Sequence, residues 1–112
     1  MIEVVGTDEF SEWYGITLSE QDAEAVTRAV EILASVGLAL GHPLSSQIKG
    51  SKYAIRELRI QSQGNPIRVF YAFDKKRQAV LIIGGDKTGD DRFYETFIPI
   101  AERIWEEYLA EQ

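Results

Sequence analysis

Basic and aromatic side chains are the residues of this chain whose types and spacing could carry out chemistry. They comprise four cations and two aromatic residues: Arg59, Arg68, Lys87, Arg92, Phe70 and Tyr94. Arginine binds phosphate through a bidentate fork of N–H donors, and aromatic rings stack on bases. This combination predicts a surface that binds phosphates and stacked bases.

Alternation along two predicted strands places the arginines on one face of a sheet. In the first strand, Glu57 and Arg59 alternate with the apolar Leu58 and Ile60. Successive side chains of a strand point to opposite faces, so the two charged residues share the face away from the core. In the second strand, Arg68 alternates with a larger apolar set that marks the core side: Ile67, Val69, Tyr71 and Phe73. We therefore expect Arg59 and Arg68 to lie on neighbouring strands of one open face.

A third predicted strand ends in the segment Gly84-Gly85-Asp86-Lys87. Glycine has no side chain, so we expect Gly84 and Gly85 to leave the backbone exposed and to make room for a ligand. Lys87 and Arg92 would then lean over the open face from its edge.

The charges of the chain are segregated along its length. Residues 32–89 hold nine of the twelve Lys and Arg residues but three of the eighteen Asp and Glu residues, although the net charge is −6. The cations Lys49, Lys52 and Arg56 precede or begin the first strand of this basic centre. Because salt confines charge effects to about 8 Å, a local cationic surface can bind phosphates on an acidic protein. The structural alternative is that the strand arginines are solvated or paired with carboxylates such as Glu57 and Asp74.

Composition excludes several classes of site. The chain has no cysteine and one histidine, His42, which excludes disulfides, thiolate metal sites and sites built from several histidines. His42 is interpreted as a loop residue, and we expect no metal and no cofactor. The segment 84–89 lacks the Walker spacing. Without a secretory segment or an apolar run near ~18 residues, the expectation is a cytoplasmic protein with no membrane contact.

The elements that position these residues fit one domain spanning residues 1–112. The pattern predicts a strand over 2–5, a brief helix that Asp8 caps and Gly15 ends, and a longer helix from Ser19 to Gly37. An irregular connection over 38–53 leads to an antiparallel meander of strands 55–62, 67–74 and 79–85. The two N-terminal helices are expected on one side of the sheet. Asp90 or Asp91 caps a final helix that Pro99 begins at a first-turn position.

Six short segments together resemble the phage-derived HigB-like toxins of the RelE/ParE superfamily. They are Gly50-Ser51-Lys52, Glu57-Leu58-Arg59, Ile67-Arg68-Val69, Ala72-Phe73-Asp74, the segment 84–89, and Phe93-Tyr94 before Pro99. The resemblance covers nearly the whole chain. It implies an α+β fold of the RelE/ParE type, in which two N-terminal helices pack on a twisted, mainly antiparallel sheet of about four strands, followed by a C-terminal helix.

The resemblance also implies partners and an activity. Such toxins are made with an antitoxin that usually has a helix-turn-helix DNA-binding domain, in a toxin–antitoxin hetero-oligomer. RelE- and HigB-type members are endoribonucleases that cleave mRNA, typically on the ribosome, and so inhibit translation. By motif, their catalytic arginine, basic residue and tyrosine correspond to Arg68, Lys87 and Tyr94 of this chain.

The chain departs from the family pattern at the general base. Where RelE-type enzymes place two lysines two residues apart, this chain has Ile55 and Glu57. The catalytic set is therefore expected to be Arg68, Lys87, Tyr94, Arg59 and Glu57, with Lys87 and Glu57 as rival bases. Arg59 and Arg68 are expected to be the cations that stabilise the phosphorane. Tyr94 is expected to stack on a base or to donate a proton. The expected RNA-binding residues are Lys49, Lys52, Arg56, Arg92 and Phe70.

Three other functions stay open on the sequence alone. A ParE-like toxin would act on DNA gyrase through protein contacts, because a shared fold does not fix function. A non-catalytic protein would use Arg59, Arg68 and Lys87 to bind RNA or the antitoxin. A phage-remnant structural protein would leave these cations solvated.

Overall fold

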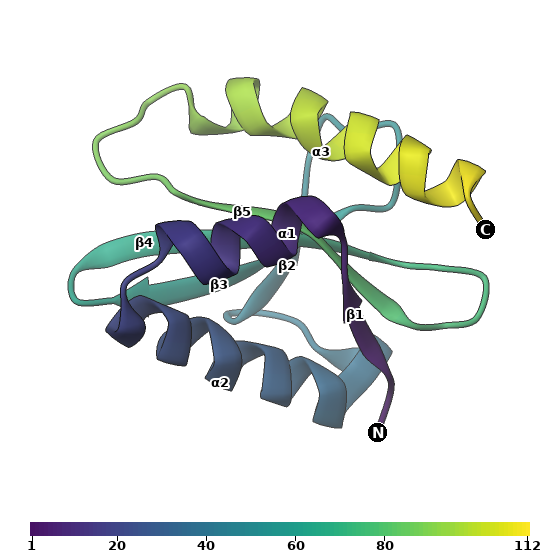
Figure 1. The fold of residues 1–112 in the computed structure, drawn as a ribbon, viewed down its shortest axis with the longest axis horizontal. Coiled ribbons are helices and arrows are strands. Elements are labelled where there is room, and N and C mark those ends of the chain that lie inside the picture. The colour runs from purple at the N-terminus through teal and green to yellow at the C-terminus, as the bar shows by residue number, and fades with distance from the viewer.

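A five-stranded sheet forms the middle layer of the protein and has helices on both faces (Figure 1). The computed structural model describes residues 1–112. In chain order the elements are β1 Val4–Gly6, α1 Asp8–Glu12, a π-helical turn Trp13–Thr17, α2 Glu20–Val36, a 3-10 turn Gly37–Ala39, β2 Ser45–Gln47, β3 Arg56–Ser62, β4 Asn65–Phe73, β5 Ala79–Asp86 and α3 Phe93–Ala110. The expected α+β class and the C-terminal helix are confirmed.

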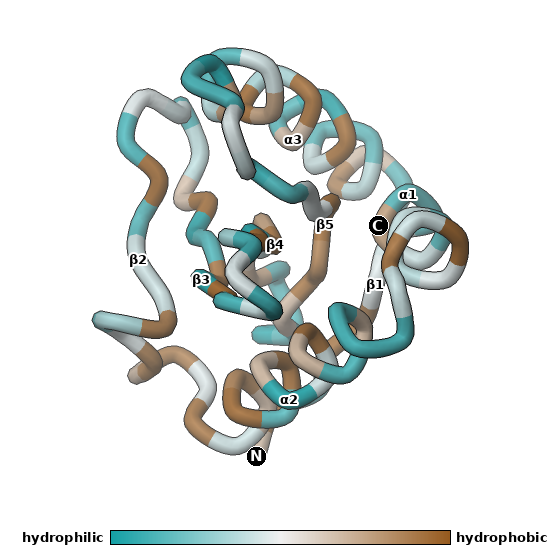
Figure 2. Tube along the Cα trace, turned by 90° about the vertical axis from the view of Figure 1, so that its left-hand side faces the viewer, coloured by the Kyte–Doolittle hydropathy of each residue, from teal (hydrophilic) through white to brown (hydrophobic).

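The strand order is β1-β5-β4-β3-β2, which can be followed from right to left in Figure 2. The expected antiparallel meander is β3, β4 and β5. Two three-residue strands extend it, because β1 pairs in parallel with β5 and β2 pairs antiparallel with β3. The sheet thus has five strands instead of about four, and the connection over 38–53 contains the edge strand β2.

The register of the meander places the two strand arginines directly opposite each other. Arg59 on β3 pairs with Arg68 on β4, and this pairing continues without a shift from Arg56 to Ser62. A register shift between Phe70 and Tyr71 lies in the pairing of β4 with β5. The irregularity therefore does not turn Arg59 and Arg68 to different faces.

The second helix, α2, forms as its sequence predicts. The Ser19 side chain accepts a hydrogen bond from the backbone N–H of Asp22, and the helix ends at Gly37, whose φ is 71°. Ala25, Val26, Ala29 and Leu33 make its buried stripe. Helical spacing puts these side chains on one face, which packs on the sheet.

The first helix differs from expectation at both ends. Its N-cap is Thr7, whose side chain accepts a hydrogen bond from the backbone N–H of Phe10, and Asp8 is the first helical residue. The chain also continues through Gly15 to Thr17 as the π-helical turn. Glycine permits a helix to end but does not force it to, and packing of the neighbouring aromatic residues Trp13 and Tyr14 on the core favours the extra turn.

The final helix, α3, begins earlier than expected. It starts at Phe93, follows Arg92 without a side-chain cap, and contains Pro99 in its interior. Proline cannot donate to the carbonyl of Glu95, one turn earlier, which costs about 3 kcal/mol in a helix interior. Pro99 and Glu95 are both exposed, so water can satisfy that carbonyl, and burial of Phe93 offsets the cost.

Each face of the sheet has its own hydrophobic core. Helices α1 and α2 cover one face, as expected, and bury residues such as Leu33, Leu58 and Val69. Helix α3 covers the opposite face and buries Phe70, Ile82 and Trp105 together with Phe93. Figures 1 and 2 show α3 and α2 on opposite sides of the strands. No helix of the structure is both long and apolar enough to cross a membrane.

Candidate functional site

A cluster of three polar side chains, two of them buried, lies between the sheet and α3. Glu57 comes from β3, Arg68 from β4 and Tyr94 from the first turn of α3. Strand alternation sends the first two to the same face, as their sequence predicts. That face was expected to be open and is instead covered by α3, so Glu57 and Arg68 are buried. Tyr94 follows Phe93, which anchors this end of the helix in the core.

The three side chains contact one another directly. The Tyr94 hydroxyl donates to Oε1 of Glu57 at 2.7 Å and accepts from Nε of Arg68 at 3.3 Å. The same Nε lies 3.6 Å from Oε1 of Glu57. The alternative that a strand arginine pairs with a carboxylate therefore holds for Arg68, whose partner in the structure is Glu57.

Burial sets the electrostatics of the cluster. Glu57 is 6% exposed and Arg68 is 7% exposed, while Tyr94 is half-buried. Burial, and then the hydrogen bond to Glu57, raise the pKa of the Tyr94 hydroxyl above its ordinary value of 10.0. Tyr94 thus keeps its proton at neutral pH and stays a hydrogen-bond donor.

A second hydroxyl holds the other oxygen of Glu57. Ser46 on β2 lies directly opposite Glu57 in the antiparallel pairing of β2 with β3. Its Oγ donates to Oε2 of Glu57 at 3.1 Å. The sequence pattern does not predict a role for Ser46, because β2 is too short to show a period. A serine three residues after a turn-forming proline, Pro43, is the faint signal that was available.

Glu57 and Tyr94 of this cluster line a hollow that we call the central groove, with a volume of about 480 Å³. Its walls carry three cations: Lys49, Arg59 and Lys87. Lys87 lies with Nζ 5.3 Å from the centroid of the Tyr94 ring, a cation–π distance. The remaining lining residues are Ser46, Gln47, Ile48, Glu57, Tyr94 and Ile98. The structure therefore brings Arg59, Lys87, Tyr94, Glu57 and Lys49 together.

Three expected RNA-binding residues lie away from the central groove. Arg56 points to the opposite face of the sheet, where its Nε donates to Ser45 and its Nη2 to the carbonyl of Leu40. Lys52 pairs with Glu106 on α3 at 3.0 Å. Arg92 is exposed just before α3 and is not among the groove residues.

The predicted roles of Phe70 and of the pair Gly84-Gly85 are wrong. Phe70 is 0% exposed and stacks on Phe93 and Phe97, so its ring has no free face for a base. The glycines are also covered by aromatic rings, because a Cβ on Gly84 would lie 2.3 Å from the Trp13 ring and one on Gly85 2.8 Å from Phe97. They provide room for the protein's own side chains and leave none for a ligand.

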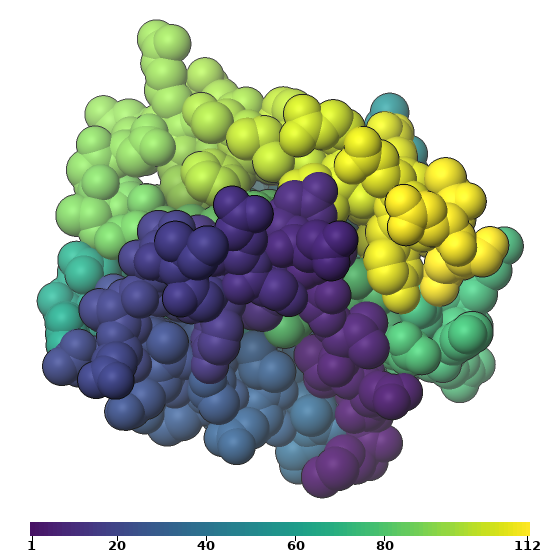
Figure 3. Space-filling view, viewed as in Figure 1, coloured from purple at the N-terminus to yellow at the C-terminus, as the bar shows by residue number.

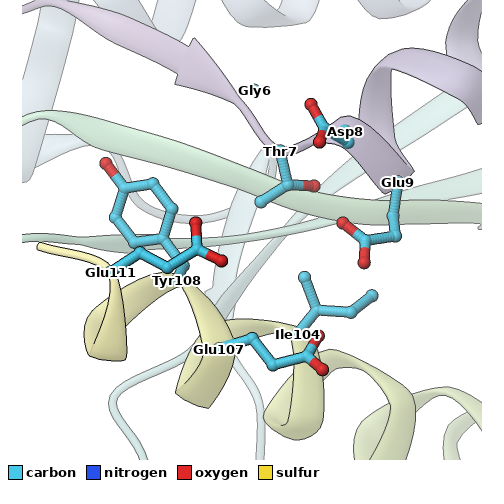
Figure 4. Close-up of a pocket in the computed structure, with 8 residues that line it drawn as sticks. All are labelled: Gly6, Thr7, Asp8, Glu9, Ile104, Glu107, Tyr108 and Glu111. Carbon is cyan, nitrogen blue, oxygen red and sulfur yellow. The ribbon is translucent and has the colours of Figure 1, made fainter.

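A different hollow lies at the other edge of the sheet, between the start of α1 and the end of α3. Figure 4 shows the carboxylates of Asp8, Glu9, Glu107 and Glu111 around it. In Figure 3 the N-terminal segment (purple) lies beside the C-terminal helix (yellow) at this place. These carboxylates would repel phosphate. No group of three His, Asp or Glu side chains in the structure could hold a metal ion.

Fold and site together define an α+β protein with a cationic groove above a buried Glu-Tyr-Arg cluster, and comparison with known proteins gives the family. Residues 16–106 match the family described as "Phage derived protein Gp49-like (DUF891)". The chain belongs to this Gp49-like family of phage-derived proteins.

Two relatives from Mycobacterium tuberculosis (strain ATCC 25618 / H37Rv) carry toxin names. The chain is 37% identical to "Putative toxin HigB3" over 102 residues, which are 89% of this chain and 87% of that protein. It is 37% identical to "Putative toxin HigB2" over 97 residues, which are 84% of this chain and 48% of that protein. The resemblance to the HigB-like toxins is confirmed by these relatives, and the chain is a toxin of the toxin–antitoxin class.

Proposed function

We propose that this toxin is an endoribonuclease that cleaves mRNA, on the ribosome, and thereby inhibits translation. The observation that carries the proposal is the position of Glu57, a carboxylate held by two hydroxyls and a guanidinium in a groove that three cations line. A fixed carboxylate beside unpaired cations suits proton transfer at a phosphodiester.

The proposed reaction uses the RNA's own 2′-hydroxyl. That oxygen attacks the adjacent phosphorus and loses its proton to a base, while the bond from phosphorus to the 5′-oxygen breaks. The leaving 5′-oxygen takes up a proton from an acid. The products are a 2′,3′-cyclic phosphate and a 5′-hydroxyl, so atoms and charges balance.

Glu57 is the base in this proposal. Tyr94 and Ser46 donate to separate oxygens of its carboxylate, which fixes the group in the groove and leaves lone pairs free to accept a proton. A positioned base of this kind contributes about 10²–10⁴ in rate. Lys87, the rival base, is a donor beside the Tyr94 ring and is assigned the role of protonating the leaving oxygen.

The cations of the groove act on the phosphate. Arg59 is exposed, and its side chain has neither a hydrogen bond nor an ion pair within the protein. Lys87 is half-buried and equally free of carboxylates. Both can stabilise the extra negative charge of the phosphorane, and one such preorganised donor is worth about 10²–10³ in rate. Lys87 also supplies the proton for the leaving group.

Arg68 and Ser46 act through Glu57 and are positioning residues. Arg68 is buried and contacts both Glu57 and Tyr94, so it fixes the positions of these two side chains. Ser46 fixes the second carboxylate oxygen.

The partners proposed with this activity are mRNA, the ribosome and a cognate antitoxin with a helix-turn-helix domain, in the cytoplasm. An antitoxin would silence the activity by covering the central groove or by blocking access to the ribosome. The toxin class of the relatives supports an antitoxin partner.

Purified protein and a defined mRNA test the activity, with and without ribosomes carrying that mRNA. We expect new RNA ends with 2′,3′-cyclic phosphate and 5′-hydroxyl groups, and no cleavage where the attacked linkage carries a 2′-deoxyribose. Intact mRNA in the presence of ribosomes, together with inhibition of purified DNA gyrase, would instead support the ParE-like alternative. RNA binding without new ends would support the non-catalytic alternative.

A further inference from the structure

A second hollow adjoins the central groove. It has a volume of about 290 Å³ and lies where the turn before β2 meets strands β3 and β4. Its lining residues are His42, Pro43, Arg59, Ile60, Gln61 and Arg68. Arg59 lines both cavities, so the second hollow begins where the central groove ends.

The polar side chains of this hollow are free to donate hydrogen bonds. Arg59, Gln61 and His42 are exposed, and their side chains make no hydrogen bond or ion pair within the protein. Arginine and glutamine each offer N–H donors, and histidine offers one or two. Unpaired donors around a hollow are available to a ligand with several acceptor oxygens.

Arg68 adds a donor that the Glu57 cluster does not use. Its Nε contacts Tyr94 and Glu57, and its Nη1 donates to the carbonyl of Ile67. Nη2 has no such partner, yet the structure contains no buried side-chain nitrogen without one, so Nη2 keeps contact with solvent. Arg68 lines the second hollow and does not line the central groove, so a ligand in the second hollow is the one that would contact Arg68.

The second hollow also lacks negative charge. None of its lining residues is Asp or Glu, whereas the central groove contains Glu57. Arg59 has no carboxylate partner, and Arg68 keeps an unpaired N–H beside its ion pair with Glu57. Together with an amide and an imidazole, these guanidinium groups offer the kind of donors that bind phosphate.

We propose that the second hollow binds a phosphate of the RNA strand next to the phosphate that is cleaved. The proposal rests on the ribonuclease function proposed above. Arg59 would lie between the two phosphates, and the free donor of Arg68 with Gln61 and His42 would hold the second one. His42, which the sequence alone places in a loop without a role, would thus belong to the RNA-binding surface.

A first experiment tests the hollow as an anion site. Inorganic phosphate is titrated into the protein while NMR follows the side-chain signals of Arg68 and His42. We expect both signals to shift in the wild type and to shift much less in Gln61→Glu, which puts a carboxylate into the hollow. The matched control is Gln21→Glu. Gln21 is also an exposed glutamine, it lies on α2, and its substitution changes the net charge by the same amount as Gln61→Glu.

A second experiment separates free phosphate from RNA. It compares two trinucleotides with uncleavable 2′-O-methyl riboses, of which one has two phosphates and the other has a neutral methylphosphonate in place of one. In the wild type and Gln21→Glu, the second phosphate should tighten binding and steepen the salt dependence of log K by about 0.7. In Gln61→Glu that gain should disappear.

The outcomes distinguish this inference from the proposed function. Phosphate-induced shifts without a gain from the second RNA phosphate would overturn the RNA role and leave a site for free phosphate only. Absence of both effects would overturn the site altogether, even if the protein cleaves mRNA. If the phosphate-induced shifts and the gain from the second RNA phosphate are both seen in a protein that leaves ribosome-bound mRNA intact, the site is supported and the ribonuclease proposal is overturned.

Discussion

A carboxylate that is to accept a proton must be held in place with a lone pair left free. Glu57 is held by two hydroxyl donors and one guanidinium, each on a different element of the fold. Each carboxylate oxygen has two lone pairs, so these contacts leave acceptor sites open. The chemistry proposed for the groove therefore depends on the residues that position Glu57 as well as on the cations that bind the phosphate.

Glu57→Gln tests the base directly. The amide keeps the size of the side chain and an oxygen acceptor for Tyr94, but it cannot accept the proton of the 2′-hydroxyl. We expect cleavage of ribosome-bound mRNA to fall about 10²–10⁴-fold. Glu102→Gln is the matched control, because Glu102 also accepts from a serine, Ser51, but lies on α3 outside the central groove. A Glu57→Gln rate within twofold of wild type would exclude Glu57 as the base.

Ser46→Ala tests positioning by separating kcat from KM. Loss of the Ser46 donor leaves one carboxylate oxygen of Glu57 unheld, so we expect kcat for cleavage to fall about tenfold while KM for RNA stays within about twofold. Ser46→Thr keeps a hydroxyl and should restore kcat. Ser51→Ala removes a similar Ser–Glu hydrogen bond at 2.9 Å elsewhere and should leave both constants unchanged. An unchanged kcat in Ser46→Ala, or a loss that Ser46→Thr does not reverse, would contradict the positioning role.

The elements that carry the site are held by contacts at some distance from it. Gly84 lies on β5 under Trp13, and a Cβ there would lie 2.3 Å from the ring. We expect Gly84→Ala to lower the free energy of unfolding by about 1–3 kcal/mol, measured by chemical denaturation. Gly41→Ala, where a Cβ would meet nothing within 4 Å, is the control. Equal stabilities for the two variants would contradict the packing described for Trp13.

Asp74 ties the end of α3 to the turn between β4 and β5. It accepts from the backbone N–H groups of Lys76 and Gln78 and from the side chains of Tyr108 and Gln112. Burial alone would raise the pKa of Asp74, but these hydrogen bonds outweigh it and lower the pKa below 3.8. The folded state thus prefers the ionised carboxylate.

The lowered pKa of Asp74 gives a pH dependence of stability. The contribution of Asp74 is present above its unfolded pKa, near 3.9, and is lost as the pH falls through the lower folded value. Asp74→Asn should lower the free energy of unfolding at pH 7 by about 1–3 kcal/mol and should weaken its decline below pH 4. Asp91→Asn, at an exposed residue, should do neither. Parallel acid unfolding curves for all three proteins would contradict this account.

The sequence predicts the elements that have a clear period and misses those that do not. Apolar alternation in β3 and β4 was sufficient to place Glu57, Arg59 and Arg68 on one face. Strand β2 has three residues and shows no period, so Ser46 could not be found. The sequence predicts that Pro99 begins α3, because the burial of Phe93 that offsets an interior proline is visible only in the tertiary structure. The sequence likewise predicts Phe70 at the surface, because nothing in the strand pattern shows that α3 covers this ring.

At the scale of the whole molecule, opposite charges lie at opposite edges of the sheet. The cationic groove lies next to β2, and the acidic hollow of Figure 4 lies next to β1. Salt screens exposed charges within about 8 Å, so the groove can attract RNA although the net charge is −6. The acidic edge would face away from the RNA.

Two lysine variants with the same net charge test this polarity. Lys49→Gln removes a cation from the wall of the groove, whereas Lys76→Gln removes one from the turn between β4 and β5. We expect Lys49→Gln to weaken RNA binding and to reduce the salt slope by about 0.7, and we expect a much smaller effect of Lys76→Gln. Equal losses in the two variants would mean that net charge, and not the groove, governs binding.

The ribonuclease proposal is tested most directly by mapping the 5′ ends of mRNA after brief induction of the toxin in a bacterial host. Wild type, Glu57→Gln and the control Glu102→Gln are compared at matched soluble levels. The account predicts new ends within coding sequences for wild type and Glu102→Gln, and few or none for Glu57→Gln. Growth arrest without new ends in the wild type, or new ends that persist in Glu57→Gln, would contradict it.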